Sequence, residues 1–381
     1  MEDSEYLRRL RDPELRAADE AVAAAAGHIS GIFGSVDKAK AIAAYERAVA
    51  HDPNLSHAWL QLGGLYGQEG HYDTSKHAFE KALATAANAG EEGVALWGLG
   101  LATADRKDRT AAEDFYARAA KRLEGIDEET ETRVKCVKNI ASIKYARGDS
   151  DAQDAMLSAR ALAAANNLPE IVLQCSHELV GLAKLRSRED DEVRFLQESL
   201  ILETRLDRKK DQARSHHLLR ALAGRRDDEA AQRLHGEQAL SLFRELGDQE
   251  GTAIELYLLG VMERDDDEME SAYEMFAECL SIAEPIGLTR FVIDSLNKLG
   301  DLDYRCDRLD DAERWLKRAL TISNETGDAQ AQAIALYTLG CVAEDQGDHR
   351  EKTANWTKAK ERAQTAGDTA MAQNIDRLLQ G

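Results

Sequence analysis

Proline, aromatic residues and cysteine are all scarce in this sequence. Of the 381 residues only four are proline and five are cysteine, and aromatic residues make up 6% of the total. Because proline breaks helices and because strands favour β-branched and aromatic residues, this composition favours an all-helical chain. The five cysteines are far apart and form no Cys-x-x-Cys pair, so they predict a reducing compartment without a disulfide framework.

Positive charge is also in short supply. Lysine and arginine total 49 against 70 aspartates and glutamates, which gives a formal net charge of −21. Such a field repels phosphate backbones and anionic lipids, so we expect no nucleic-acid partner and no membrane insertion. A basic protein segment is the natural partner of an acidic surface, although a surface that only keeps the chain in solution explains the same charge.

Long apolar runs are missing as well. No stretch approaches the length of a transmembrane helix, and the acidic start, Met1-Glu2-Asp3, lacks the pattern of a signal peptide. The sequence therefore predicts a cytoplasmic protein.

The short motifs of common catalytic and cofactor sites do not occur. His177-Glu178 continues as Leu-Val-Gly and supplies no second metal ligand, and the acidic run 265–268 lacks the glycine and the terminal glutamate of a calcium loop. His216 and His217 are adjacent, so on a helix they point in different directions. Four other histidines are expected in surface and packing roles: His51, His57, His71 and His77. We predict a protein that is not an enzyme and holds no cofactor or metal.

Beside these absences, the sequence repeats itself every forty residues from 253 to 367. The repeat is marked by Leu-Gly pairs at 259–260, 299–300 and 339–340 and by turn glycines at 247, 287, 327 and 367. A period of this length predicts a solenoid, whose units bury their apolar faces only against one another. Three of the turn glycines precede aspartate, which predicts a left-handed glycine that ends one helix and an aspartate that caps the next.

The most legible motif lies between residues 59 and 82. It reads Trp59-x-x-Leu62-Gly63-x-x-Tyr66, followed by Phe79 and Ala82. This segment resembles the tetratricopeptide repeat (TPR), in which two antiparallel helices form one hairpin. It departs from the family pattern where that pattern has alanine and proline, at Ser75 and Ala87. On helices, the first three large residues form one apolar stripe, and the glycine lets the second helix approach.

The resemblance implies one all-α fold for the whole chain. We expect a right-handed α-solenoid, a TPR superhelix of about nine antiparallel helical hairpins between residues 14 and 366. Residues 1–13 are expected to be a flexible N-terminus and 368–381 a capping helix. Units in 14–90 have the standard TPR length, whereas those in 91–367 resemble the longer, forty-residue TPR subclass of bacterial regulators and polarity adaptors.

Pro285 conflicts with its helix. It lies two residues before Gly287, where the sister units carry Glu245, Glu325 and Thr365. Because proline lacks an N–H and crowds the preceding turn, we predict that this helix ends early or bends.

In TPR proteins the ligand groove is lined by the first helix of each hairpin, so the resemblance places it just before each Leu and just after each Gly. The residues predicted there are His57, Gln61, Trp97, Lys135, Lys138, Asn139, Ser142, Tyr145, Arg214, His217, Tyr257, Asn297, Lys298, Tyr304 and Tyr337. Their bases, amides and aromatic rings suit an acidic or carboxylate-terminated peptide. The resemblance to chaperone-tail-binding TPR domains is partial, because Lys135, Lys138 and Asn139 lie in one unit. Ordinary solvated residues that face inward explain the same stripe.

The sequence therefore favours a non-catalytic scaffold or adaptor that binds an extended peptide or a helix of a partner protein in its groove. The partner is acidic if it lies in the groove and basic if it binds the outer face. One alternative is a regulatory sensor, whose groove binds a small peptide or metabolite and so alters partner binding. A third, an enzyme with dispersed site residues, has no support in the sequence. Self-association is left open.

Overall fold

The structure is a computed structural model that describes residues 12–30, 37–105 and 108–380. In these segments all regular structure is helical, with nineteen α-helices and one short 3-10 helix. The predicted all-α fold is confirmed. The chain divides into two compact units, residues 1–195 (the N-terminal unit) and 196–381 (the C-terminal unit), which are described separately.

The N-terminal unit consists of successive helical hairpins. Its helices are α2 (Pro13–Ser30), α3 (Lys38–His51), α4 (Ser56–Gln68), α5 (Tyr72–Thr85), α6 (Ala89–Asp105), α7 (Arg109–Arg122), η1 (Asp127–Glu129), α8 (Thr130–Arg147), α9 (Ala152–Ala165) and α10 (Pro169–Leu185). The helices α2 and α3, α4 and α5, α6 and α7, and α8 and α9 pack as pairs, and each second helix also packs against the next first helix. The boundary between the units falls within α11 (Glu189–Arg205). The expected flexible N-terminus lies largely outside the described residues.

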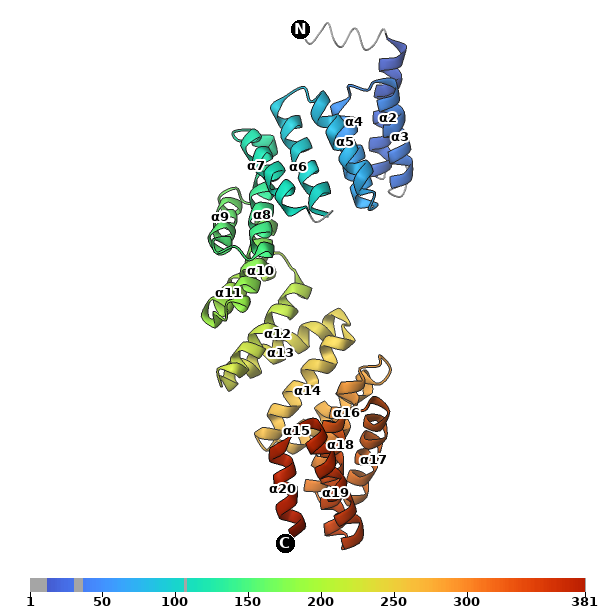
Figure 1. Cartoon of the computed structure of the whole chain (residues 1–381), viewed down its shortest axis with the longest axis vertical. Coiled ribbons are helices and arrows are strands. Elements are labelled where there is room, and N and C mark those ends of the chain that lie inside the picture. Colours follow the sequence, from blue (N-terminus) through green and yellow to red (C-terminus); the bar gives the residue numbers. More distant parts are fainter. Residues whose placement is uncertain (1–11, 31–36, 106–107, 381) are drawn as a thin grey trace. The chain divides into compact units, whose positions relative to one another are not determined.

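The C-terminal unit continues in the same way. Its helices are α12 (Lys209–Arg225), α13 (Glu229–Leu246), α14 (Gln249–Asp265), α15 (Met269–Ala283), α16 (Thr289–Arg305), α17 (Leu309–Thr326), α18 (Ala329–Asp345), α19 (His349–Ala366) and α20 (Thr369–Gln380). The pairs run from α12 with α13 to α18 with α19, and α20 packs on α19 (Figure 1). Eight of the nine predicted hairpins thus pack as pairs within one unit, and the ninth, α10 with α11, falls at the boundary between the units.

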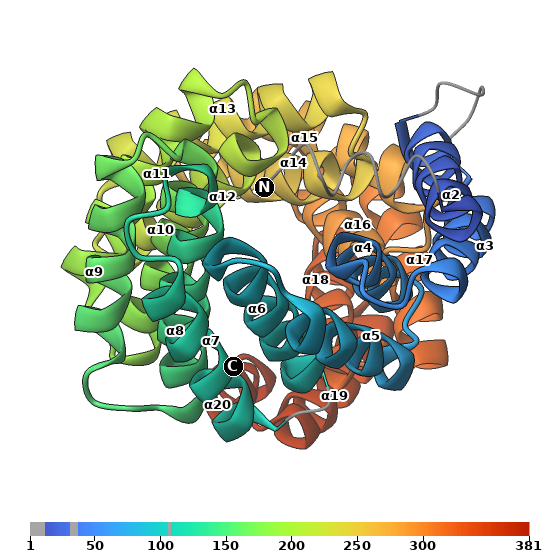
Figure 2. The same cartoon turned by 90° about the horizontal axis from the view of Figure 1, so that it is seen from above.

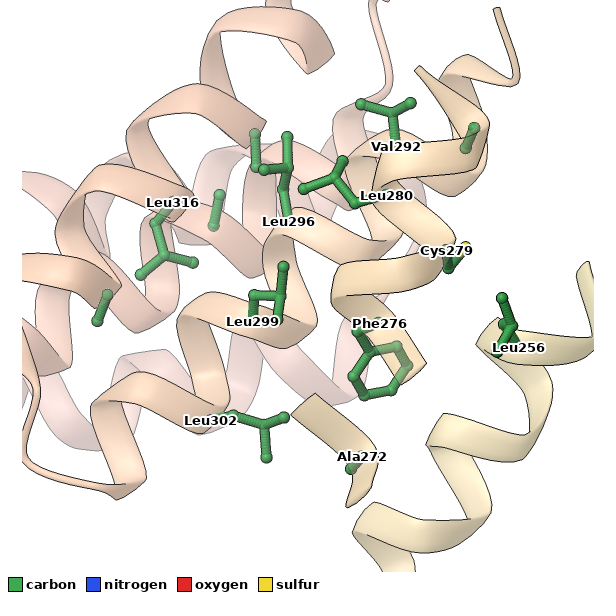
Figure 3. Packing of buried hydrophobic residues seen from close by; sticks show 14 of the residues in the cluster. Leu256, Ala272, Phe276, Cys279, Leu280, Val292, Leu296, Leu299, Leu302 and Leu316 are labelled. Atoms are coloured by element: carbon green, nitrogen blue, oxygen red, sulfur yellow. The ribbon is translucent and has the colours of Figure 1, made fainter. Parts of the chain in front are cut away.

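The forty-residue repeat marks positions with one packing role. The three Leu residues of the Leu-Gly pairs are buried, and Leu299 lies in the cluster that Figure 3 shows around Phe276 and Leu316. The glycines are needed because a β-carbon at Gly260, Gly300 or Gly340 would crowd or overlap a large side chain of the partner helix. These partner side chains also recur every forty residues, as Phe276, Leu316 and Trp356.

The Gly-Asp turns work as predicted. Gly247 has a φ of 67°, in the left-handed region that glycine adopts without strain, and ends α13. The next residue, Asp248, accepts a hydrogen bond from the N–H of Gly251 at 3.0 Å and so caps α14. The same arrangement recurs at Gly327-Asp328 and Gly367-Asp368.

Pro285 shortens its helix, as the sequence predicts. Helix α15 ends at Ala283 after 15 residues, whereas its counterparts α13, α17 and α19 have 18 residues each and end at the residue before the turn glycine. Proline has no N–H to continue the hydrogen-bond ladder, so the chain passes through a turn to Gly287.

Helix α20 covers the end of the last hairpin. Ala372 and Ile375 are buried, and Met371 and Leu379 pack beside them. Leu378 on the same helix is 37% exposed.

Candidate functional site

Most of the predicted groove residues lie on the first helices of the hairpins. Within the C-terminal unit, Figure 2 shows α16 and α18 on the inner side and their partners α17 and α19 on the outer side. Because the two units are separate bodies, the predicted stripe is described in two parts.

In the N-terminal unit the predicted lysines already have partners. Lys135 Nζ lies 2.6 Å from Glu131 Oε1 and 5.9 Å from the centroid of the Trp97 ring. Lys138 Nζ lies 3.1 Å from Glu178 Oε1, on the first helix of the next hairpin. Carboxylates of the protein itself therefore pair with the two lysines that were predicted to bind a peptide ligand.

The other predicted residues of this unit serve the same contacts or lie apart. Ser142 Oγ is 2.9 Å from Glu178 Oε1, and the Tyr145 hydroxyl lies where a side chain at Gly181 would be. His57 is exposed, whereas Gln61 and Asn139 are partly buried. The residues of this unit thus form no open polar cluster that we can assign to a ligand.

The C-terminal unit brings four predicted residues together. Tyr257 on α14, Asn297 and Lys298 on α16 and Tyr337 on α18 line one pocket of about 340 Å³. The other lining residues are Asp294, Asp301, Ile334, Thr338 and Met371. The pocket thus spans three successive first helices and the capping helix α20. Tyr304, also predicted, does not line it.

Asn297 holds a buried hydrogen-bond acceptor that has no partner among the described residues. Its side chain is only 5% exposed, and its Nδ2 lies 3.5 Å from the carbonyl oxygen of Ala331. The acceptor that lacks a partner is its Oδ1. Because a buried acceptor without a donor costs free energy, the site is incomplete until a ligand or solvent supplies an N–H or O–H.

Lys298 is a desolvated cation. Burial lowers the pKa of its ammonium, and the charge of Arg264 lowers it further. Burial also raises the pKa of the Asp294 carboxyl, which lies one turn earlier on α16. The pocket therefore holds charged groups where water solvates them poorly.

The nearby carboxylates are matched by arginines. Asp294 Oδ2 lies 3.6 Å from Arg290 Nε, and Asp301 Oδ2 lies 3.1 Å from Arg305 Nε. No carboxylate of the described segments comes within ion-pair distance of the Lys298 ammonium. The Lys298 ammonium therefore has no ion-pair partner there, while the charges of Asp301, Asp265 and Asp294 act on it from longer range.

The tyrosines give the pocket apolar walls. Burial raises the pKa of Tyr257 to about 12 and also raises that of Tyr337, so both hydroxyls stay protonated at neutral pH. The Tyr257 ring packs at 5.6 Å, centroid to centroid, from both Phe276 and Phe291. Such rings are rigid contact surfaces with a hydroxyl at one end.

On α12, one of the two residues predicted to line the groove forms a hydrogen bond within the protein instead. Arg214 is exposed, but His217 Nδ1 is hydrogen-bonded to Glu255 Oε1. Glu255 is completely buried, and its Oε2 lies 2.9 Å from Arg220 Nε, in a contact that is an ion pair without hydrogen-bond alignment. His217 therefore links the inner side to a buried charge pair.

Around Arg220, the large and the small residue of the two helices have changed places relative to the next hairpin. Arg220 stands forty residues before Gly260, and Gly236 stands forty residues before Phe276. A β-carbon on Gly236 would lie 3.0 Å from Arg220 Cδ and 2.9 Å from Leu259 Cδ2. In this hairpin the first helix supplies the large side chain and the second helix the glycine, which explains why its sequence matches the repeat weakly.

His216 does not act with His217, as their adjacency predicts. Its Nδ1 lies 3.0 Å from Nδ1 of His235 on α13, so one neutral ring donates to the other. Burial, with a smaller contribution from His235, lowers the pKa of His216 to about 4, and burial lowers the pKa of His235 as well.

This histidine pair predicts a loss of stability in acid. The ordinary His216 pKa is 6.5 and the folded value is about 4, so between these pH values the unfolded chain binds more protons. The stability that neutral His216 contributes to the fold is complete above pH 6.5 and is lost as the pH falls towards 4. We expect the thermal midpoint of His216→Asn to depend less steeply on pH across this window. The matched control, exposed His57→Asn, keeps the wild-type slope; equal slopes for all three proteins would refute the pair.

The described segments hold neither a cluster of metal ligands nor a helix that could span a membrane. They contain no group of three or more His, Cys, Asp or Glu side chains that could hold a metal ion. They also contain no helix that is both long and apolar enough to cross a membrane.

Comparison with known families decides what the repeat is. One model of the tetratricopeptide repeat matches residues 56–88, in the N-terminal unit, and another matches residues 291–351, in the C-terminal unit. The chain contains tetratricopeptide repeats in both of its units. None of the curated proteins matches the sequence.

One solved structure shares the fold of this chain, and others resemble parts of it. A signal transduction ATPase with numerous domains from Pyrococcus horikoshii, which has a tetratricopeptide repeat sensor, is 13% identical and matches with a TM-score of 0.61. The match covers 98% of this chain but only 56% of that protein. The pilus biogenesis factor PilW is 18% identical over 60% of this chain and 94% of its own, with a TM-score of 0.46. RapI in its apo form is 12% identical over 71% and 98%, with a TM-score of 0.45.

Proposed function

We propose that this TPR protein is a non-catalytic scaffold or adaptor, and that the Lys298 pocket of its C-terminal unit binds an extended acidic segment of a partner protein. One observation carries the proposal: Lys298, whose ammonium forms no ion pair with the described residues, lines the same pocket as Asn297, whose buried Oδ1 has no hydrogen-bond partner among them. TPR solenoids present such extended inner surfaces to their ligands.

Both groups fit one stretch of extended peptide. A backbone N–H of the peptide would donate a hydrogen bond to Asn297 Oδ1. Side-chain amides recognise the main chain of an extended peptide in this way. An acidic side chain of the same segment would pair with Lys298 in a charge-assisted hydrogen bond, which is stronger in a poorly hydrated pocket than in water. The rings of Tyr257 and Tyr337 would supply contact area.

Charge selects the acidic partner over a basic one. Since Asp294 and Asp301 have arginine partners, a lysine or arginine in the pocket would meet the free ammonium of Lys298 and be repelled. A carboxylate would instead compensate the desolvated cation. The pocket thus presents a poorly hydrated cation in a chain whose net charge is −21.

The test uses a labelled octapeptide library with one glutamate in an alanine, serine and leucine background, and a matched library in which glutamine replaces the glutamate. We expect the glutamate library to bind wild type more tightly in fluorescence anisotropy. Lys298→Glu should weaken binding by roughly 10- to 100-fold, the worth of one hydrogen bond to a charged group. Asn297→Ala should weaken both libraries, because it removes main-chain recognition.

Two controls separate the pocket from net charge. Lys358→Glu reverses the charge of an exposed lysine on α19, and Lys135→Glu/Lys138→Glu alters the lysines that already have carboxylate partners. Both variants should bind within a factor of about two of wild type. Equal losses in Lys358→Glu and Lys298→Glu, or no preference for glutamate over glutamine, would defeat the proposal.

A further inference from the structure

A second pocket, which shares no residue with the Lys298 pocket, lies between α13 and α14. Its volume is about 500 Å³. It is lined by Glu229, Ala230, Gln232, Arg233, Leu258, Val261, Met262, Asp265 and Asp266. We call it the α13–α14 pocket.

Its floor is apolar at a position where the fold does not require it. Leu258 and Val261 are only partly buried. Forty residues later, in the next hairpin, the same positions of α16 carry Lys298 and Asp301. Val261 and Met262 also pack against the core cluster of this unit, but Leu258 does not, and because the next hairpin folds with a lysine at its position a leucine is not needed there for packing between helices. An apolar surface that packing does not explain indicates a contact with another molecule.

Its rim is acidic. Glu229, Asp265 and Asp266 are exposed, and Asp267 and Glu268 follow at once in the chain. The nearby guanidinium groups are engaged. Arg233 pairs with Glu263 and Asp266, and Arg264 Nη2 lies 2.6 Å from Asp265 Oδ1. Asp265 and Asp266 are thus matched by arginines, whereas Glu229, Asp267 and Glu268 form no ion pair with the described residues, so the rim keeps a negative charge and attracts cations.

We propose that the α13–α14 pocket docks a basic amphipathic helix of a partner protein. An apolar side chain of that helix would cover Leu258, Val261 and Met262, and flanking lysine or arginine side chains would pair with the rim. Apolar contact supplies most of the affinity in such helix docking, and the charges set orientation and the rate of association. The site differs from the Lys298 pocket in residues and in the sign of the charge that it takes.

The repeat provides its own test substitution. Leu258→Lys/Val261→Asp installs the residues that α16 carries at these positions, so the variant is expected to fold. The probe is a labelled 18-residue peptide with leucines at helical spacing i, i+3, i+4, i+7 and lysines elsewhere. Its control is a scrambled isomer of the same composition. We expect wild type to bind the amphipathic peptide at least tenfold more tightly than the isomer, and the variant to lose this preference.

Charge variants locate the rim. Glu229→Lys/Asp266→Lys should weaken binding of the amphipathic peptide by tenfold or more at low salt. The matched reversal of exposed acids elsewhere, Asp310→Lys/Glu325→Lys, should change it about twofold at most. If the isomer binds as well as the amphipathic peptide, or if Leu258→Lys/Val261→Asp binds like wild type, the α13–α14 pocket is not the docking site.

The same variants keep the two proposals independent. Lys298→Glu should leave binding of the basic peptide intact, and Leu258→Lys/Val261→Asp should leave binding of the acidic library intact. Loss of one activity therefore does not depend on loss of the other.

Discussion

Replacement of Arg220 by glycine should destabilise the C-terminal unit by about 3–5 kcal/mol, the cost of removing one partner from a buried ion pair. Glu255 is completely buried, and Arg220 is 6% exposed. Without the guanidinium, the Glu255 carboxylate keeps only His217, and the space beside Gly236 is left empty. The free energy of unfolding, followed by circular dichroism in urea, measures the loss.

A triple variant tests whether the exchange of large and small residues is the cause. Arg220→Gly/Gly236→Phe/Glu255→Ser installs the residues that stand forty positions later in the chain, Gly260 on α14, Phe276 on α15 and Ser295 on α16. Because a well-packed apolar replacement of a buried ion pair is often neutral or stabilising, stability should return to the wild-type value or exceed it. Hydrogen exchange of the amides in α12 to α14 should recover together. A triple variant no more stable than Arg220→Gly would show that the two hairpins do not pack interchangeably.

The same network explains why His217 differs from its counterparts. Tyr257, Asn297 and Tyr337 occupy its position in the later hairpins, and all three line the Lys298 pocket. His217 instead bonds to Glu255 and thereby helps to hold Arg220 in the core. The inner side of α12 thus contributes to folding, whereas the inner side of α14, α16 and α18 lines the Lys298 pocket.

Much of the fold could be predicted from the sequence because the repeat fixes which face of each helix is buried. Forty residues return each Leu-Gly pair to the same environment, so the burial of Leu259, Leu299 and Leu339 follows from one unit. Local chemistry predicts the Gly-Asp turns and the early end of α15 at Pro285, since both depend on backbone geometry within a few residues.

The candidate site could be predicted only in part, because side-chain pairing between repeats is not local. From the sequence, Lys138 and Lys298 were both predicted to line the groove and to bind an acidic peptide. The structure gives Lys138 a carboxylate from the next first helix, Glu178, and leaves Lys298 without one. Alignment of the units contains one signal that was missed. An arginine at a glycine position and a glycine at an aromatic position, Arg220 and Gly236, indicate a hairpin with its own packing.

Leu299→Asp should cost more than the loss of a leucine. Burial of this side chain contributes roughly 1.5–3 kcal/mol, and an aspartate in its place adds the desolvation of a carboxylate without a partner, so we expect a loss of several kcal/mol. Leu299 is fully buried in the cluster with Phe276 and Leu316 (Figure 3). Thermal unfolding of the whole chain measures the effect.

The control for this variant is the same substitution at an exposed leucine. Leu234 on α13 is 54% exposed, so Leu234→Asp should change stability by no more than about 0.5 kcal/mol. Amide exchange should then show the loss in Leu299→Asp spreading through α14 to α18, because each hairpin is stabilised by its neighbours in a solenoid. If Leu299→Asp unfolds at the wild-type temperature, the assignment of buried faces along the forty-residue repeat is wrong. The Lys298 pocket would be wrong with it, because Lys298 is placed on the inner face by the same register that buries Leu299.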